Sequence, residues 1–329
     1  MSRLTKITMS LAAVLMLLHS TTVSAVLNMG GQSTFAGTVI EVLEPGPDIQ
    51  AIIDNITDAS AGNPYLIHLG PGVYDLGFGN IVMKAWVSIQ GSGQESTKIT
   101  GIMSGASTDA NSATVAGANN TFLTDLTITN TGTGSITIAI FNSSVSPRIE
   151  RVTANALGGI QKFGIRNESS SPIMTDVTAS ASGGSDNYGV YNTSSSPTMT
   201  NITATASDGT DNYGVYNTTS SSPIMTNVTA TASGTNNIGV NNLDSSSPAM
   251  TNVMARASSG TISTGAVSDN ASPYIQDSIL EGAIRSLSIT SDSTGARVVN
   301  SKLDGSVLDS AAGTQCRGNY DGNLTAVTC

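Results

Sequence analysis

Apolar and polar residues alternate with a period of two along much of the chain, and the alternating segments return at a nearly constant distance. Residues 227–233 (NVTATAS) place every second side chain on one face. This pattern is typical of β-strands and does not fit the three- and four-residue spacing of an amphipathic helix. One proline recurs in each period, at intervals of 25, 25, 26, 25 and 25 residues: Pro147, Pro172, Pro197, Pro223, Pro248 and Pro273. A repeat of this length predicts stacked units that bury their hydrophobic faces against their neighbours.

Three positions in each period are predicted to face the interior. Counted from the proline, a bulky apolar residue stands two places on, a second stands five places on, and a small residue stands seven places on. In the period that starts at Pro197 these residues are Met199, Ile202 and Ala204. Bulky, bulky and small groups stacked in successive coils would fill a narrow core.

The inward positions two and five places after the proline are three residues apart, which strict alternation does not allow. We therefore expect a turn at the polar residue four places after the proline, which lies between them. Asparagine and aspartate tolerate the left-handed backbone that such a corner needs. In register, their side chains can hydrogen-bond to the copies above and below. The predicted ladder comprises Asp125, Asp176, Asn201, Asn227, Asn252, Asp277 and Asn300.

With this ladder, residues 122–305 resemble the right-handed parallel β-helix proteins of the pectin lyase-like superfamily. The resemblance implies an all-β fold, a single-stranded right-handed parallel β-helix. At about 25 residues per coil, residues 81–312 would form about nine coils. The superfamily includes pectate lyases, polygalacturonases, pectin methylesterases, phage tailspikes and adhesins, so the resemblance specifies the architecture and leaves the activity open.

Residues 64–101 resemble the opening of pectin methylesterases, in which a capping helix leads to a strand and a Gly-Xaa-Tyr turn. Gly72, Val73 and Tyr74 match that turn. The segments that carry the catalytic carboxylate and arginine of that family are absent from the sequence, so no catalytic residue transfers.

A short amphipathic helix is predicted at about residues 47–57, within an N-terminal cap that covers residues 26–80. Isoleucines follow helical spacing through this segment, and Asp48 can cap its first turn. Its apolar side would cover the open end of the solenoid and block the pairing of strands from another molecule.

Residues 1–25 predict a secretory signal peptide that is cleaved near Ala25, because Arg3 and Lys6 precede a short apolar run. The run falls short of the roughly 20 apolar residues that cross a bilayer. We expect no membrane span in the mature chain and a secreted or periplasmic location. Cys316 and Cys329, the only cysteines, are expected to form one disulfide that closes a C-terminal cap at residues 313–329.

The predicted mature chain is strongly acidic, because loss of Arg3 and Lys6 changes the formal net charge from -10 to -12. Nucleic acid is therefore not expected as a partner. A polyanion such as pectate would be repelled unless calcium bridged the two, whereas neutral glycans would not be excluded. His68 is the only histidine of the predicted mature chain, so histidine triads and multi-histidine metal sites are not indicated.

An outward row on the strand before the proline is the first candidate site. The row comprises Arg166, Tyr191, Tyr216 and Asn241. It is expected to lie beside a shallow strip of Gly164, Gly189, Gly214 and Gly239. Aromatic faces in such a row could lie under sugar rings, with the arginine and asparagine as polar contacts. The alternative is that the tyrosines stack on their own copies in an exposed strand.

Asp186 and Asp211, in the loop before that strand, form the second candidate site. Oxygen ligands from adjacent coils could hold calcium, and the sequence indicates no other cofactor. The alternative is that these aspartates form turns in water. A lyase would also need a base, and Arg166 and Lys162 are the basic residues one coil away.

The preferred hypothesis is an exported, non-catalytic β-helix that binds an extracellular polysaccharide or cell-surface glycan through the outward row. The alternative is a polysaccharide lyase or hydrolase that acts on an extracellular glycan. The sequence indicates no oligomeric state.

Overall fold

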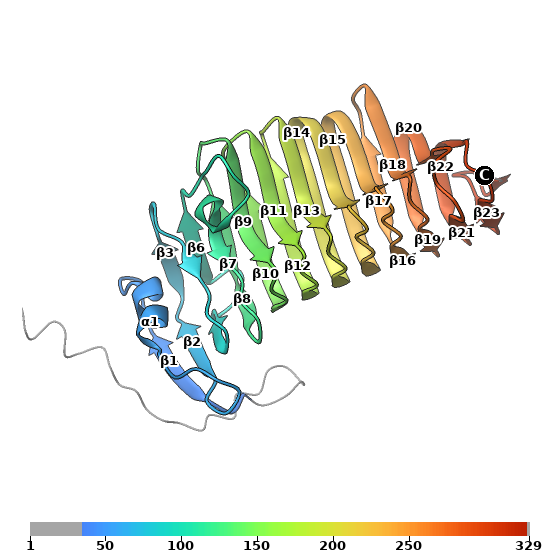
Figure 1. Ribbon diagram of the computed structural model, residues 1–329. Helices are drawn as coiled ribbons and strands as arrows, with labels where there is room; N and C mark the ends of the chain where they lie inside the picture. The colour runs from blue at the N-terminus through green and yellow to red at the C-terminus, as the bar shows by residue number, and fades with distance from the viewer. Residues whose placement is uncertain (1–34, 328–329) are drawn as a thin grey trace, which may run out of the picture.

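The structure is a computed structural model that describes residues 35–327. The chain winds coil upon coil into an elongated solenoid, from the blue N-terminal end to the red C-terminal end (Figure 1). Its strands form one continuous sheet, in which all strand pairs are parallel apart from one closing hairpin. The predicted signal peptide lies outside the described residues and stays a prediction.

The elements follow the chain in three groups. The first is β1 (Thr38–Val42), α1 (Ile49–Asn55), β2 (Tyr65–Leu69), β3 (Gly72–Asp75), β4 (Ile81–Val82), β5 (Val87–Gln90), β6 (Thr97–Gly101), the 3-10 helix η1 (Ala110–Ser112) and β7 (Ala113–Ala116). The regular coils contain β8 (Phe122–Asn130), β9 (Ile136–Ser143), β10 (Arg148–Ala156), β11 (Gln161–Glu168), β12 (Ile173–Ser182), β13 (Asp186–Thr193), β14 (Thr198–Thr218) and β15 (Ile224–Leu243). The last group is β16 (Ala249–Thr251), β17 (Met254–Ser258), β18 (Ile262–Asp269), β19 (Tyr274–Gln276), β20 (Ile279–Ile289), β21 (Arg297–Val299), β22 (Lys302–Asp309), β23 (Gln315–Arg317), β24 (Asn319–Tyr320) and β25 (Ala326–Val327).

The predicted parallel solenoid is confirmed, with neighbouring coils paired residue for residue. Met174 on β12 lies opposite Met199 on β14, which lies opposite Met225 on β15. The solenoid has about 11 coils, more than the nine predicted. The difference arises because β1 and β2, which fall within the predicted cap, already pair in parallel as the first coils.

The three predicted interior stacks form the core. In the coil of β14, Met199, Ile202 and Ala204 are at most 1% exposed. The first stack is buried along its whole length: Ile149, Met174, Met199, Met225, Met250 and Ile275. These stacks belong to a single hydrophobic cluster that runs through the solenoid. The core therefore grows along the axis instead of widening, which lets a chain with 4% aromatic residues fill it.

The predicted corner ladder is also confirmed. Its backbone φ angles lie between 49° and 60°, in the left-handed region, at Asp125, Asp176, Asn201, Asn227, Asn252, Asp277 and Asn300. Asn201 donates to Asp176 at 2.8 Å, Asn227 to Asn201 at 3.0 Å and Asn252 to Asn227 at 2.7 Å. Arg151 occupies the ladder position between Asp125 and Asp176, with the same left-handed backbone, and donates to Asp125 at 2.5 Å.

Two further columns of asparagine lie inside the solenoid. The first comprises the fully buried Asn142, Asn167, Asn192, Asn217 and Asn242. Each of the first four amides donates to the next one at 2.8–2.9 Å, and Asn242 donates to the carbonyl of Val267 at 3.2 Å. In the second column, Asn187 donates to Asn212 at 2.9 Å and Asn212 to Asn237 at 3.1 Å. These amides satisfy one another away from water, so they tie successive coils together.

Lys162 occupies the place before Asn187 in the second column, and its replacement by asparagine should stabilise the protein. The lysine is 1% exposed, and burial lowers the pKa of its ammonium group. Lys162→Asn would remove this desolvated charge and add a donor for Asn187, so the free energy of unfolding should rise by about 1 kcal/mol. Urea denaturation measures the change, with exposed Lys98→Asn as a control that should have little effect. A loss of stability in Lys162→Asn would contradict the column.

The two ends of the solenoid are closed differently. Helix α1 falls within the predicted residues 47–57 and lies at the N-terminal end (Figure 1). Asp48 accepts from the backbone N–H of Ala51 at 3.1 Å, and Ile53 packs into the core. At the other end β24 pairs antiparallel with β25, which ends the parallel stacking. No helix within residues 35–327 is long and apolar enough to cross a membrane.

The predicted disulfide stays a prediction. Cys316 on β23 is partly buried against the core. Cys329, its expected partner, lies outside the described residues.

Candidate functional site

The outward row of the sequence lies in register on four coils. Arg166 on β11 is opposite Tyr191 on β13, followed by Tyr216 on β14 and Asn241 on β15. A second row, which the sequence did not indicate, runs beside it: Phe163, Tyr188, Tyr213 and Ile238. We refer to Tyr188, Tyr191, Tyr213 and Tyr216 as the tyrosine cluster.

The rings of the tyrosine cluster stack along each row. Tyr188 lies between Phe163 and Tyr213, with ring centroids 4.8 and 5.2 Å away and nearly parallel planes. Tyr191 and Tyr216 stack at 5.0 Å. Rings of different rows meet edge to face, as in the Tyr188–Tyr191 pair at 5.1 Å. The inner ring faces are therefore covered by other rings, so the interpretation that each tyrosine stacks on its own copy describes these rings better than open faces do.

The glycines that separate the two rows face the interior, so the predicted shallow glycine strip is wrong. A Cβ atom on Gly214 would lie 2.7 Å from the carbonyl oxygen of Gly239 and 2.8 Å from the backbone nitrogen of Thr231. Only glycine allows the backbone to approach the opposite strand this closely. Val215 also points inward, so two consecutive residues face the core and the tyrosines on both sides of them point outward.

The N-terminal end of the cluster is closed by a cation. The guanidinium carbon of Arg166 lies 4.7 Å from the ring centroid of Phe163 and 4.4 Å from that of Tyr191. Arg166 also pairs with Glu168 at 2.5 Å. At the other end, Tyr213 and Tyr216 are the last rings of their rows, and each stacks on an aromatic ring on one side only among the described residues.

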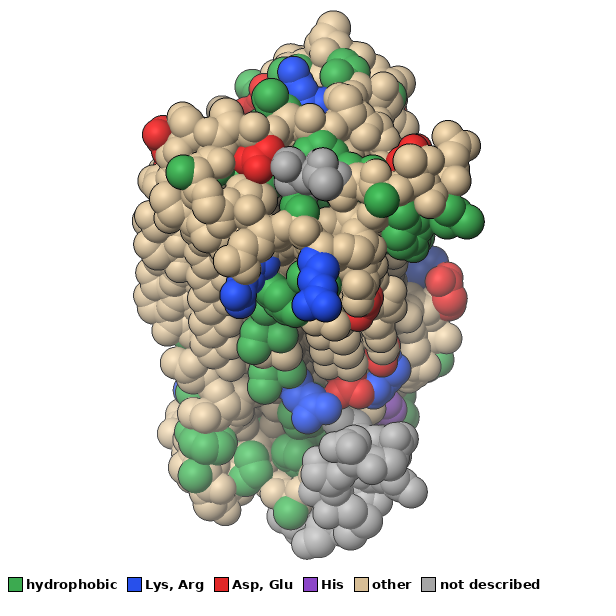
Figure 2. Space-filling model, turned by 90° about the vertical axis from the view of Figure 1, so that its right-hand side faces the viewer, with side chains coloured by type: hydrophobic (Ala, Val, Ile, Leu, Met, Phe, Trp, Pro, Cys, Tyr) green, Lys and Arg blue, Asp and Glu red, His purple; other side chains and the backbone are tan. Residues whose placement is uncertain are grey.

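The tyrosine hydroxyls are kept neutral by their surroundings. Burial, reinforced by Asp211 and Asp186, raises the pKa of Tyr213 to about 12. Burial likewise raises the pKa values of the other three tyrosines above the ordinary value. The hydroxyls can thus donate hydrogen bonds at neutral pH. Figure 2, seen from the C-terminal end, shows charged side chains as scattered spots on a largely uncharged surface.

Asp186 and Asp211 lie in register on adjacent coils, as predicted. Each accepts from a flanking amide, Asp186 from Gln161 at 2.9 Å and Asp211 from Asn236 at 2.8 Å. Within residues 35–327, no three His, Cys, Asp or Glu side chains gather closely enough to hold a metal ion. Calcium at this pair stays a prediction.

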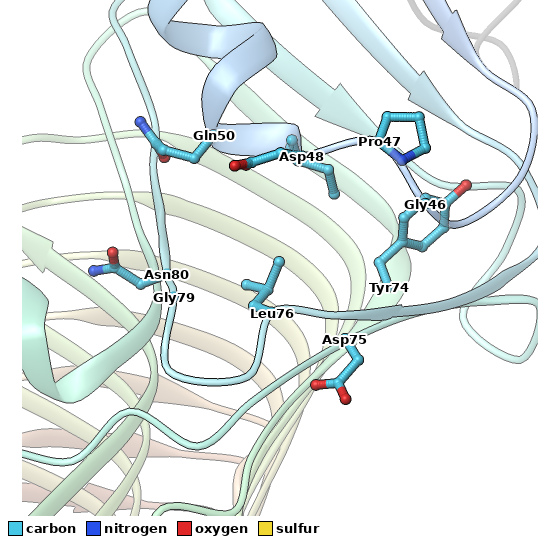
Figure 3. A pocket seen from close by; sticks show the side chains of 10 residues that line it. Gly46, Pro47, Asp48, Gln50, Tyr74, Asp75, Leu76, Gly79 and Asn80 are labelled. Atoms are coloured by element: carbon cyan, nitrogen blue, oxygen red, sulfur yellow. The ribbon is translucent and has the colours of Figure 1, made fainter. Parts of the chain in front are cut away.

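A pocket of about 500 Å³ lies between the start of α1 and the loop of Leu76, Gly79 and Asn80 (Figure 3). Its polar groups already hold the cap together. Gln50 Oε1 accepts from the backbone N–H of Val82, and Asn80 Nδ2 donates to the carbonyl of Ala110, both at 2.8 Å. The pocket is therefore explained by the packing of the cap.

His68 is also structural. Its Nδ1 lies 2.6 Å from Glu41 Oε2 on the neighbouring strand, so it links β2 to β1.

No protein-family model matches the chain, and no curated protein matches its sequence. The A-module of mannuronan C-5 epimerase AlgE4 from Azotobacter vinelandii aligns with a TM-score of 0.58 at 18% identity and covers 84% of each chain. Pectate lyase Pel9A aligns with a TM-score of 0.52 at 13% identity, over 89% of this chain and 82% of that one. This chain is a right-handed parallel β-helix. A pectin methylesterase from Yersinia enterocolitica aligns with this β-helix at a TM-score of 0.44 and 15% identity, over 63% and 78% of the two chains.

Proposed function

We propose that this β-helix binds an extracellular polysaccharide at the tyrosine cluster. The observation that carries the proposal is that four of its eight tyrosines gather on two adjacent coils outside the main core, where Tyr188 and Tyr191 pack against a second apolar cluster that includes Phe163. The fold does not require rings there, because Ile238 and Asn241 take the same two positions in the next coil. Tyrosine combines an apolar ring with a hydrogen-bonding hydroxyl, which suits the surface of a sugar.

The structural neighbours support the same class of partner. One is named for mannuronan and the other for pectate, and both are polysaccharides. A secreted or periplasmic location, as the N-terminal sequence predicts, would expose the protein to such chains.

The alternative function is a polysaccharide lyase or hydrolase. The named activities of the neighbours agree with it, and Asp186 and Asp211 would be its carboxylates. A lyase also needs a base near the carboxylates. The side chain of Lys162 is buried, and Arg166 is paired with Glu168, so the surroundings of the two aspartates favour binding over catalysis.

The double substitution Tyr191→Ala with Tyr216→Ala should weaken polysaccharide binding at least tenfold. It removes the stacked rings of the outward row. A sugar would lose the edges and hydroxyls of both rings and the outer face of Tyr216, which is the last ring of the row. A glycan array would identify the retained polysaccharide, and titration calorimetry would compare the affinities. Tyr274→Ala, which alters an exposed tyrosine on β19 outside the cluster, is the matched control.

Unchanged binding by the double variant would contradict the proposal. The same preparations, incubated with polysaccharides with and without calcium, would be assayed for unsaturated products and new reducing ends. Products that form with the wild type and vanish with Asp211→Ala would establish the enzymatic alternative instead.

A further inference from the structure

Asn241 ends the outward row, and its side chain forms no hydrogen bond within the described part of the chain. The residue is 4% exposed, and its Oδ1 is buried without a partner. The neighbouring buried amides differ: Asn237 donates to the carbonyl of Gly234, and Asn242 is held by Asn217 and Val267. A buried amide oxygen without a donor destabilises the folded state, so the fold alone gives no reason for an amide at this position.

One other asparagine oxygen is unpaired in a similar way, but its place explains it. Asn142 Oδ1 is the free acceptor at the first amide of the buried column, whose remaining members are all paired. Asn241 belongs to no column. Its neighbours in register are Tyr216 on one side and Val267 on the other.

The side chains of both rows become shorter at the coil of Asn241. Tyr213 and Tyr216 are the last rings of their rows, and the next coil carries the shorter Ile238 and Asn241 in the same positions. The outer faces of the two rings therefore meet no aromatic partner, in contrast to the inner faces. An aromatic face without a ring partner beside an unpaired amide is a combination that holds a sugar, because C–H groups of the sugar can lie on the ring while a hydroxyl bonds to the amide. A half-turn of the amide about its Cβ–Cγ bond exchanges Oδ1 with Nδ2 and would turn the buried oxygen toward the ligand.

Two carboxylates lie near this place. Asp211 stands two residues before Tyr213 on β14, and Asp244 accepts from the hydroxyl of Thr218, two residues after Tyr216, at 2.6 Å. Besides burial, each carboxylate raises the pKa of the neighbouring tyrosine hydroxyl. The positive charge of Arg166 is already paired with Glu168. The other basic residue of the two rows is Arg285, three coils beyond Tyr213 and about 14 Å along the axis at the usual strand spacing.

We propose that Tyr213, Tyr216 and Asn241 form a subsite for an uncharged sugar residue, and that the nearby carboxylates exclude uronates. The inference rests on the proposed function and adds the class of sugar. A ligand carboxylate placed here would be repelled by Asp211 and Asp244, whereas a neutral pyranose would meet only the ring faces and the amide.

Two matched pairs of polymers test the class of sugar: mannan against polymannuronate, which differ in the oxidation of C6, and fully methyl-esterified polygalacturonate against polygalacturonate, which differ in the charge of the C6 carboxyl group. At low ionic strength, where the repulsion is least screened, the neutral member of at least one pair should bind at least tenfold more tightly than its uronate. A uronate that binds as well as its neutral counterpart would overturn the inference and leave polysaccharide binding intact. If neither these polymers nor a glycan array shows retention, the proposed function fails and the inference fails with it.

Asn241→Leu tests the residue. The affinity for the retained neutral polymer should fall about tenfold, while the melting temperature should stay the same or rise, because leucine removes an unpaired buried amide. Asn242→Leu, one residue further on, breaks the buried column and should lower the melting temperature. If Asn241→Leu is destabilised as much as Asn242→Leu, the amide is structural and the assignment is wrong. Unchanged affinity in a stable Asn241→Leu protein would also overturn it.

Discussion

Replacement of Asn192 by leucine should lower the free energy of unfolding by about 2–6 kcal/mol. Asn192 is fully buried, accepts from Asn167 and donates to Asn217, both at 2.8 Å. Leucine has the same branched shape, with methyl groups in place of the amide oxygen and nitrogen, so it leaves Asn167 Nδ2 and Asn217 Oδ1 buried without partners. Each orphaned group costs about 1–3 kcal/mol, so the two together produce the expected loss. Thermal and urea denaturation, followed by circular dichroism, measure it.

Thr203→Val is the matched control for Asn192→Leu, because it replaces an exposed side chain by one of nearly the same shape. It should alter the free energy of unfolding by less than about 0.5 kcal/mol. Coils of a solenoid contact only their neighbours, so hydrogen exchange in Asn192→Leu should accelerate most around residues 167–217. A loss of stability no larger than that of the control would show that the buried column contributes little.

Gly214→Ala should destabilise the solenoid by more than about 3 kcal/mol. The added Cβ would lie 2.7 Å from the oxygen of Gly239 and 2.8 Å from the nitrogen of Thr231, and both are backbone atoms that no side-chain rotation can move. The opposite strands would have to separate, which would open the core beside Val215. Since Tyr213 and Tyr216 flank the glycine, the near-ultraviolet circular dichroism of the tyrosines should weaken together with the melting temperature.

Gly62→Ala is the control for this substitution. A Cβ on Gly62 would meet no atom within 4 Å, so this variant should melt like the wild type or slightly above it. If Gly214→Ala melted at the temperature of Gly62→Ala, the two strands would not approach each other as closely as the structure indicates.

The core could be predicted from the sequence because two periods reinforce each other. Alternation marks Met199 and Ala204 as inward, and the 25-residue repeat puts their equivalents in the same place in each coil. The left-handed corner at Asn201 could be predicted because few residue types other than glycine tolerate that backbone.

The site was harder to predict because the backbone departs from alternation there. Counting by twos from Val190 places Tyr188 inside, whereas Gly189 and Val190 both face the core and Tyr188 points outward. The same count does place Asn192 inside, but a buried amide is acceptable only when its partners are known. Those partners are Asn167 and Asn217, which the stacking of coils supplies and the local sequence does not.

The equivalence of successive coils has a consequence for how this gene can change. Because Met174 and Met199 occupy the same place in adjacent coils, unequal recombination between their codons would delete residues 174–198 and leave no mismatched junction. The shortened protein would stack Phe163 on Tyr213 and Arg166 on Tyr216, so the cluster would lose one pair of rings and keep both ends. The reciprocal duplication would lengthen it by one pair. The number of rings in the tyrosine cluster is thus set by the number of coils, which a lineage can alter in one event without selecting a single new side chain.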